Sequence, residues 1–383
     1  MPTLLPGLLI ALSMAASAAT VPAPFETIAM QAEAARVQDR VPDAIRLYRE
    51  GTGLRPSWAD GWWYLASLLY DQDRFSEAAE AFRHLLASTP RRGPAYAFLG
   101  LCEYETGSYD DSLAQFRAWA AAGWAGTPEL RNVAVFHFAL LLTREGKFVE
   151  SLYLLGTEAK LVGDLPALTE AMGLASLRIR NLPENYPPEQ RERVWLAGKA
   201  AFYESQSPRN FARANEFADR LEARYPGLPE VHYFRATLDE VESDQDGAER
   251  EYRAELKISP NHAPALTALA GIDLQKADRD EAGLLARRAI AADGNYAEAH
   301  HMLGRTLLDS GDAQGALTEL ETAKRLAPTN PLVHSHLAMA YSKLGRRQEA
   351  KTETETFLSL KRTESGMAPP EEDSGTRAAR IKK

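Results

Sequence analysis

Small residues recur at a fixed step of 34 positions along most of this 383-residue sequence, and this spacing limits the possible folds more than any other feature. They form two series, one that starts at Ala44 and one that starts at Ala214. The first series continues at Ser151 after one longer step of 39. Both series share one phase, because 214 − 44 is 170, or five steps of 34. A period of this length is typical of repeat arrays. The two series consist of Ala44, Ala78 and Ser112, and of Ala214, Ala248, Ala282, Ala316 and Ala350.

Each unit of 34 residues carries two apolar stripes at helical spacing. Prolines such as Pro90 and Pro328 follow the second stripe, where they cannot continue a helix. Glycines such as Gly107 and Gly311 stand between the stripes. A unit therefore holds two helices of about 13 residues joined by tight turns. In residues 59–92 the stripes are Trp62, Leu65, Ala66 and Leu69, then Ala78, Phe82 and Leu85.

These residues resemble the tetratricopeptide repeat family. The best match is residues 297–330, where Leu303-Gly304, Leu307, Gly311, Ala316, Ala323 and Pro328 follow the family pattern. The resemblance implies an all-α fold, an α-α superhelix that forms a right-handed solenoid of helix-turn-helix repeats. We expect nine units, starting at Phe25, Ala59, Gly93, Asn132, Trp195, Pro229, Ala263, Ala297 and Pro331.

The predicted organisation has five parts. Residues 1–19 are expected to be a signal peptide, because a short apolar stretch runs into small residues, although no Lys or Arg precedes it. Repeat blocks are predicted at 20–163 and 191–364. Residues 164–190 do not fit a unit and suggest one helix followed by a Pro-rich linker. Residues 365–383 lack periodicity and suggest a disordered tail.

Composition excludes several classes of function. The net charge of −9 gives no basic footprint for nucleic acid, and the single cysteine, Cys102, excludes an intrachain disulfide. After the N-terminal segment no stretch is long and apolar enough for membrane insertion of the mature chain. The sequence contains no phosphate-binding loop, zinc-protease motif or nucleophile elbow. We therefore expect no catalytic residue, cofactor or metal, and a protein that is not an enzyme.

The resemblance implies a protein or peptide partner bound in the concave groove of the first helices, with no counterpart here to the Lys and Asn clamp that some relatives use for a C-terminal carboxylate. Aromatic and charged side chains at groove positions are the candidate contacts. The alternative is that these side chains pack between neighbouring helices. The candidate partner-binding residues are Trp63, Tyr70, Tyr104, Phe136, Tyr233, His301 and Arg305.

Charged residues also stand at positions where the pattern expects core. Arg235 is predicted to pair with Asp239 or Glu255, because an unpaired charge inside the stack would cost several kcal/mol. His232, His300 and His334 share the fourth position of their units, so we expect them to pack against the second helix. A metal site is not favoured, because His334 and His336 lack the spacing of two ligands on one helical face.

The leading hypothesis is a non-catalytic scaffold that docks a protein partner after export, in the periplasm or outside the cell. The alternative is an accessory or regulatory subunit of a cytoplasmic enzyme complex. Fold alone does not distinguish the two.

Overall fold

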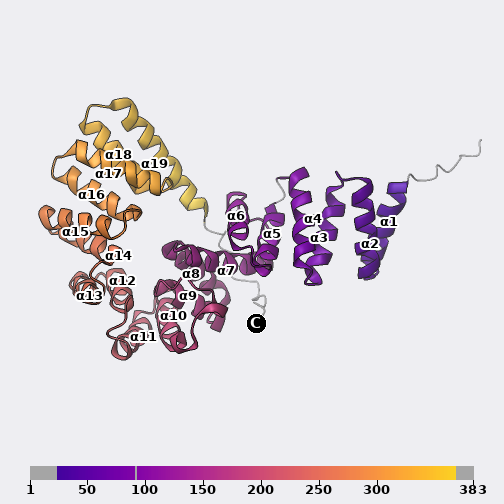
Figure 1. The fold of residues 1–383 in the computed structure, drawn as a ribbon, viewed down its shortest axis with the longest axis horizontal. Helices are drawn as coiled ribbons and strands as arrows, with labels where there is room; N and C mark the ends of the chain where they lie inside the picture. Colours follow the sequence, from indigo (N-terminus) through magenta and orange to yellow (C-terminus); the bar gives the residue numbers. More distant parts are fainter. Residues whose placement is uncertain (1–23, 91–92, 368–383) are drawn as a thin grey trace, which may run out of the picture. The chain divides into compact units, whose positions relative to one another are not determined.

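The structure is a computed structural model that describes residues 24–90 and 93–367. Within these residues the chain forms nineteen α-helices and no β-strand, and consecutive helices pack as antiparallel pairs (Figure 1). The predicted all-α array of helix-turn-helix units is confirmed. The chain divides into two compact units, Met1–Pro90 and Arg91–Lys383.

The first unit holds two helix pairs. They are α1 (Pro24–Val37) with α2 (Val41–Leu54), and α3 (Ala59–Asp71) with α4 (Phe75–Ser88).

The second unit holds seven pairs and one additional helix, α9 (Pro166–Ser176). The pairs are α5 (Gly93–Glu105) with α6 (Tyr109–Ala121), α7 (Pro128–Glu145) with α8 (Phe148–Val162), α10 (Arg191–Ser205) with α11 (Phe211–Arg224), α12 (Val231–Val241) with α13 (Gln245–Ile258), α14 (Ala263–Gln275) with α15 (Arg279–Ala292), α16 (Ala297–Asp309) with α17 (Ala313–Leu326), and α18 (Pro331–Lys343) with α19 (Arg347–Met367). All nine predicted units correspond to a pair.

A left-handed residue joins the two helices of most pairs. Gly107, Gly146, Gly311 and Gly345 have positive φ, which glycine adopts without steric cost. Non-glycine residues take the same conformation at the equivalent turns, for example Ala277 with φ 64°. The repeat geometry therefore imposes the turn even where the residue does not favour it.

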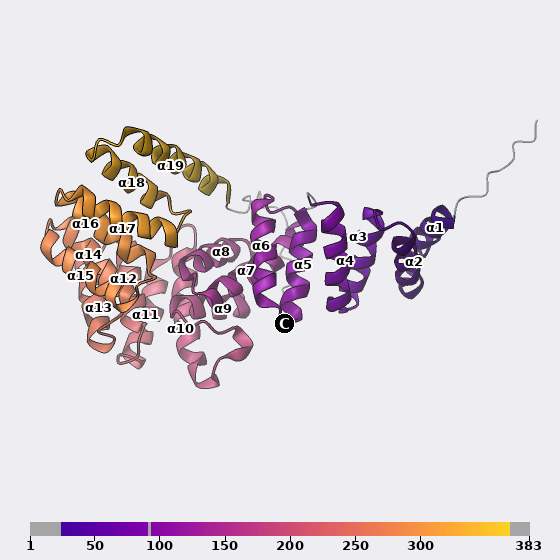
Figure 2. The same ribbon diagram turned by 45° about the horizontal axis from the view of Figure 1, so that its top comes forward.

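Helix α9 is a packed member of the array. It contacts α8 on one side and α10 on the other (Figure 2). A Cβ atom on Gly198 of α10 would lie 1.9 Å from the Thr169 carbonyl oxygen, and one on Gly173 of α9 would lie 1.9 Å from the Val194 carbonyl oxygen. Residues 164–190 thus contain one helix, as expected, but that helix lies inside the second unit. It ends at Ser176, and two 3-10 turns, Pro183–Asn185 and Pro188–Gln190, follow it.

Small residues bring the helices of a pair together elsewhere as well. A Cβ atom on Gly304 would lie 2.6 Å from Leu320 Cγ and 3.3 Å from the Ala316 carbonyl oxygen, so α16 and α17 approach closely at this glycine. Cys102 of α5 is fully buried in this packing. Within the described residues, no helix combines the length and apolar character needed to cross a bilayer.

The ion pair predicted for Arg235 is present, and Glu255 has a different role. Arg235 Nε donates to Asp239 Oδ1 at 3.0 Å, as predicted, and its Nη1 donates to Asp219 Oδ1 at 2.7 Å. Glu255 is fully buried and instead accepts the backbone N–H groups of Glu230 at 3.1 Å and Tyr233 at 3.4 Å. Its carboxylate therefore satisfies the N-terminal donors of α12, where a negative charge is favoured.

Two predictions concern residues that the structure covers little or not at all. The predicted signal peptide at 1–19 lies outside the described residues. Helix α19 extends to Met367, three positions into the segment expected to be a disordered tail, and residues 368–383 of that segment also lie outside.

Candidate partner-binding site

All seven predicted partner-binding residues stand on the first helix of a pair. In the second unit α5 contacts α7, and α16 contacts both α14 and α18. We call the outward side of these helices the first-helix surface. In the second unit this surface carries Tyr104 on α5, Tyr233 on α12, and His301 and Arg305 on α16, whereas Trp63 and Tyr70 lie on α3 of the first unit.

Trp63 and Tyr70 stand on α3 of the first unit and pack against the second helix of their own pair. The Trp63 ring meets Phe82 edge-on at 6.0 Å between centroids, and the Tyr70 ring meets Phe75 at 5.6 Å. Both side chains are half-buried. Packing between helices, the alternative interpretation, therefore explains the buried part of each ring. The other part of each ring is accessible to solvent.

Tyr104 and Phe136 both contact His137, a residue that was not among the predicted contacts. The Tyr104 ring on α5 meets His137 of α7 edge-on at 4.6 Å, and Phe136 precedes that histidine. Burial raises the pKa of the Tyr104 hydroxyl and lowers the pKa of His137. Phe136 is only 6% exposed, so its ring belongs to the interior of the stack.

Tyr233 on α12 is the centre of a cluster of aromatic and charged side chains. Its ring meets His262 at 4.8 Å and Tyr252 at 5.6 Å between centroids. The Arg178 guanidinium lies 5.6 Å from the Tyr233 ring centre and 4.5 Å from that of Phe148, within range of cation–π attraction. Burial raises the pKa of Tyr233 to about 12, so this hydroxyl stays a neutral hydrogen-bonding group.

His301 and Arg305 stand one turn apart on α16, and α18 adds His336 beside them. His301 Nε2 lies 2.8 Å from His336 Nδ1, which is also 2.9 Å from the Leu332 carbonyl oxygen. One proton on His336 Nδ1 can donate to both acceptors, provided that His301 is neutral at Nε2. Among the described residues Arg305 forms no ion pair, so its half-buried guanidinium is open to an anion.

Protonation of His301 is expected to destabilise the second unit. Burial, the nearby His336 and Arg305 lower the pKa of His301 to about 4, whereas an unfolded histidine titrates near pH 6.5. The folded state then binds fewer protons, so stability is complete above about pH 6.5 and is lost as the pH falls toward 4. Between pH 7 and pH 5 the wild type should lose about 1–2 kcal/mol more unfolding free energy than His301→Gln. Denaturant titrations at both pH values measure this difference, and parallel losses in the two proteins would contradict it.

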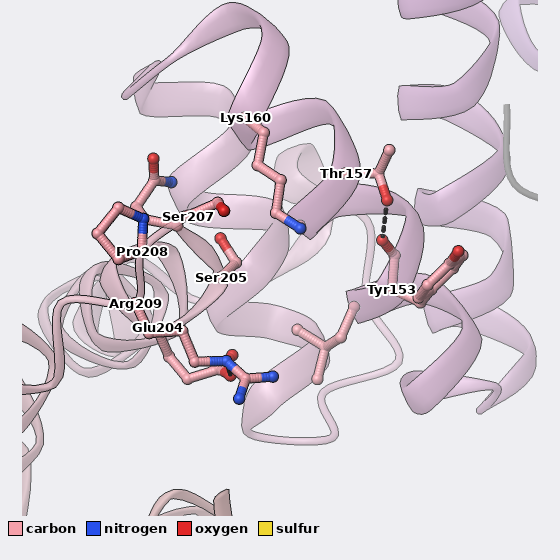
Figure 3. Close-up of a pocket in the computed structure, with 11 residues that line it drawn as sticks. Tyr153, Thr157, Lys160, Glu204, Ser205, Ser207, Pro208 and Arg209 are labelled. Atoms are coloured by element: carbon pink, nitrogen blue, oxygen red, sulfur yellow. Dashed lines mark hydrogen bonds and ion pairs between the residues drawn. The ribbon is translucent and has the colours of Figure 1, made fainter. Parts of the chain in front are cut away.

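A pocket of about 480 Å³ lies between α8 and residues 204–209, which lead from α10 toward α11 (Figure 3). Lys160 and Thr157 of α8 face Ser205 and Arg209 across it. Arg209 Nε also lies 3.1 Å from Glu204 Oε1. Burial raises the pKa of Glu204, while Arg209 and Lys160 oppose that shift. The pocket contains none of the predicted site residues.

The structure thus brings the predicted residues into small local groups rather than one site. His301 and Arg305 form one group with His336, and Tyr104 is joined to α7 through His137. Tyr233 gains Arg178, which the sequence analysis did not single out because it lies beyond the end of α9. No local pattern in the sequence indicates a role for Arg178. His336 was considered only as a possible metal ligand with His334, and not as a neighbour of His301.

Comparisons with known proteins agree with the helix pairs. The tetratricopeptide repeat family matches residues 29–92, 65–127 and 267–331. A relative, cellulose synthase operon protein C of Xanthomonas axonopodis pv. citri (strain 306), is 28% identical over 159 residues. That alignment covers 39% of this chain and only 10% of the relative's length.

Comparison with solved structures gives matches at low identity and low TM-score. Yeast Tom70 is 11% identical, with 89% of this chain and 86% of that chain covered and a TM-score of 0.38. MamA from Desulfovibrio magneticus RS-1 is 19% identical over 41% of this chain and 89% of its own, with a TM-score of 0.36. YrrB, described as a TPR protein with an unusual peptide-binding site, is 16% identical over 44% and 88%, with a TM-score of 0.35. From the matched segments and the nine helix pairs we conclude that the chain belongs to the tetratricopeptide repeat family.

Proposed function

We propose that the chain is a non-catalytic scaffold that binds a protein or peptide partner on the first-helix surface. The observation that carries this proposal is the group on α16 and α18, where Arg305 lacks an ion-pair partner among the described residues and two half-buried histidines flank it. Stacked repeats offer extended surfaces on which several modest contacts add up to affinity. The chemistry of this group suits a carboxylate of the partner.

Substitution of Arg305 tests the proposal. The full mature chain, immobilised, should capture its partner from an extract of the producing cells, and Arg305→Ala should weaken capture about tenfold, which corresponds to about 1.4 kcal/mol. Arg325→Ala is the matched control, because Arg325 is an exposed arginine on α17, the second helix of the same pair. Equal capture by both variants would show that the partner does not use the Arg305 group.

The place of action belongs to the same proposal. The apolar stretch and small residues at 1–19 support export to the periplasm or the exterior, where the scaffold would serve an assembly outside the cytoplasm. A native protein whose first residue is Ala19 or Thr20 would support export, and an intact Met1 would count against it.

A second candidate function is an accessory or regulatory subunit of an enzyme complex. The relative named for the cellulose synthase operon favours it, although the alignment spans a small part of that protein. The partner recovered in the capture experiment separates the two functions: an enzyme whose rate changes when the scaffold is removed supports the subunit, and a partner without activity supports the scaffold.

A further inference from the structure

Four successive joints of the second unit can be compared position by position. Each joint is made by one residue near the end of a second helix, one residue on the next first helix and one on the next second helix, and equivalent residues are 34 positions apart. In chain order the joints are Glu222, His232 and Glu251; Leu256, Leu266 and Leu285; Ile290, His300 and Glu319; and Lys324, His334 and Glu353.

The three histidine joints share one geometry. Histidine Nε2 faces a backbone carbonyl of the preceding turn, at 3.0 Å from Pro226, 3.2 Å from Gly294 and 2.9 Å from Pro328. Histidine Nδ1 faces the carboxylate of the second helix, at 2.8, 2.7 and 2.5 Å. The prediction that these histidines pack against the second helix is confirmed, and the repetition shows that the pair is a structural tether.

The residue near the end of the preceding second helix decides the charge of the joint. Lys324 Nζ donates to Glu353 Oε1 at 2.7 Å, so the last joint contains its own cation. In the joint of His300 and Glu319 the equivalent residue is Ile290, so that joint contains one carboxylate and no cation of its own. Glu222 instead adds a second carboxylate, whose Oε1 lies 3.9 Å from His232 Nδ1.

The joint of Glu222, His232 and Glu251 therefore concentrates negative charge. Its nearest guanidinium, Arg250, lies 3.2 Å from Glu251 Oε1 but is 69% exposed, so solvent screens it. The side chains of His232 and Glu251 are only 12% and 10% exposed. His232 Nδ1 faces the Glu251 carboxylate at 2.8 Å and the Glu222 carboxylate at 3.9 Å, so a positive centre, either a proton on Nδ1 or a metal ion, must lie between the nitrogen and the acids.

We propose that Glu222, His232 and Glu251 bind a divalent transition-metal ion of the zinc type. Their ligand atoms all lie within 4.8 Å of one another and come from three consecutive helices, α11, α12 and α13. Tetrahedral zinc with bonds of about 2.0–2.1 Å requires ligand atoms about 3.3 Å apart, which small side-chain rotations here can reach. The Pro226 carbonyl orients the histidine as second-shell acceptors do in metal sites. Glu222 is 35% exposed, so water can enter and take the fourth position.

Zinc titration of the full chain after removal of metal by a chelator tests the site. His336→Asn is used as the background in every protein, because it removes the His301–His336 pair as a competing ligand set. Isothermal titration calorimetry at pH 7 should give one zinc per chain. Glu222→Gln should weaken binding at least tenfold, and it keeps the fold because Glu222 makes no close bond in the tether.

Glu319→Gln is the matched control, because it neutralises the equivalent carboxylate in a joint where Ile290 stands in place of Glu222. It should leave zinc affinity unchanged. The Glu222→Lys variant copies the Lys324 joint and should abolish zinc binding while the thermal midpoint without metal stays level or rises. Absence of zinc binding in the background protein, or equal affinity in Glu222→Gln, would overturn the proposal.

Discussion

Gly198→Ala should destabilise the second unit by about 3 kcal/mol or more. Its new methyl group would lie 1.9 Å from the Thr169 carbonyl oxygen and 3.1 Å from the Gly173 backbone nitrogen, so neither neighbour can yield as a flexible side chain would. Helices α9 and α10 would have to separate by more than 1 Å to reach normal van der Waals contact. Denaturant unfolding of the full chain measures the loss.

Gly271→Ala provides the control for this substitution. Gly271 is also helical, on α14, but a Cβ atom there would meet only the flexible end of Met302 at 3.3 Å. Alanine has a higher helix propensity than glycine, so this change should be neutral or stabilise by up to about 1 kcal/mol. Equal effects of the two substitutions would mean that α9 and α10 are not held at backbone contact.

Glu353→Leu should cost about 3 kcal/mol, because it removes the acceptor of two donors at once. Glu353 is 5% exposed and accepts from His334 Nδ1 and Lys324 Nζ. His334 is itself 3% exposed, so water cannot replace the lost bond without opening the joint. The thermal midpoint of the second unit should fall accordingly.

The double variant His334→Leu with Glu353→Leu should recover more than half of that loss. The chain already contains an apolar joint, since Leu266 and Leu285 occupy the equivalent positions and are 0% and 2% exposed, with Leu256 in place of Lys324. Replacing both members of a buried polar pair by apolar side chains is often neutral or stabilising. A double variant as unstable as Glu353→Leu alone would mean that size and shape, rather than the unpaired donors, limit this joint.

Sequence periodicity predicted the nine helix pairs because burial recurs at a fixed step in every unit. It also predicted that one helix near Pro166 falls outside the repeat, but not that α9 packs between α8 and α10. The close approach depends on Gly173 and Gly198, which are 25 positions apart and follow no repeat phase. Such contacts between elements leave no local signal in the sequence.

The charged residues show the same limit. Pairing of Arg235 with Asp239 could be predicted because the two share one helical face, whereas Glu255 could not be assigned to the N-terminus of α12 from spacing alone. Metal binding was not favoured from spacing along one helix, but His232 meets acids from two other helices. How far Tyr70 and Tyr104 are covered by neighbouring rings likewise depends on tertiary packing.

The buried position of Cys102 makes the native chain suitable for labelling experiments. Its thiol is the only one in the sequence and is fully covered by the helices around α5. A cysteine introduced on the surface can therefore carry a fluorophore or spin label while the native thiol remains unmodified. Slow reaction of Cys102 itself with a thiol reagent would measure how often the helices around α5 open to solvent.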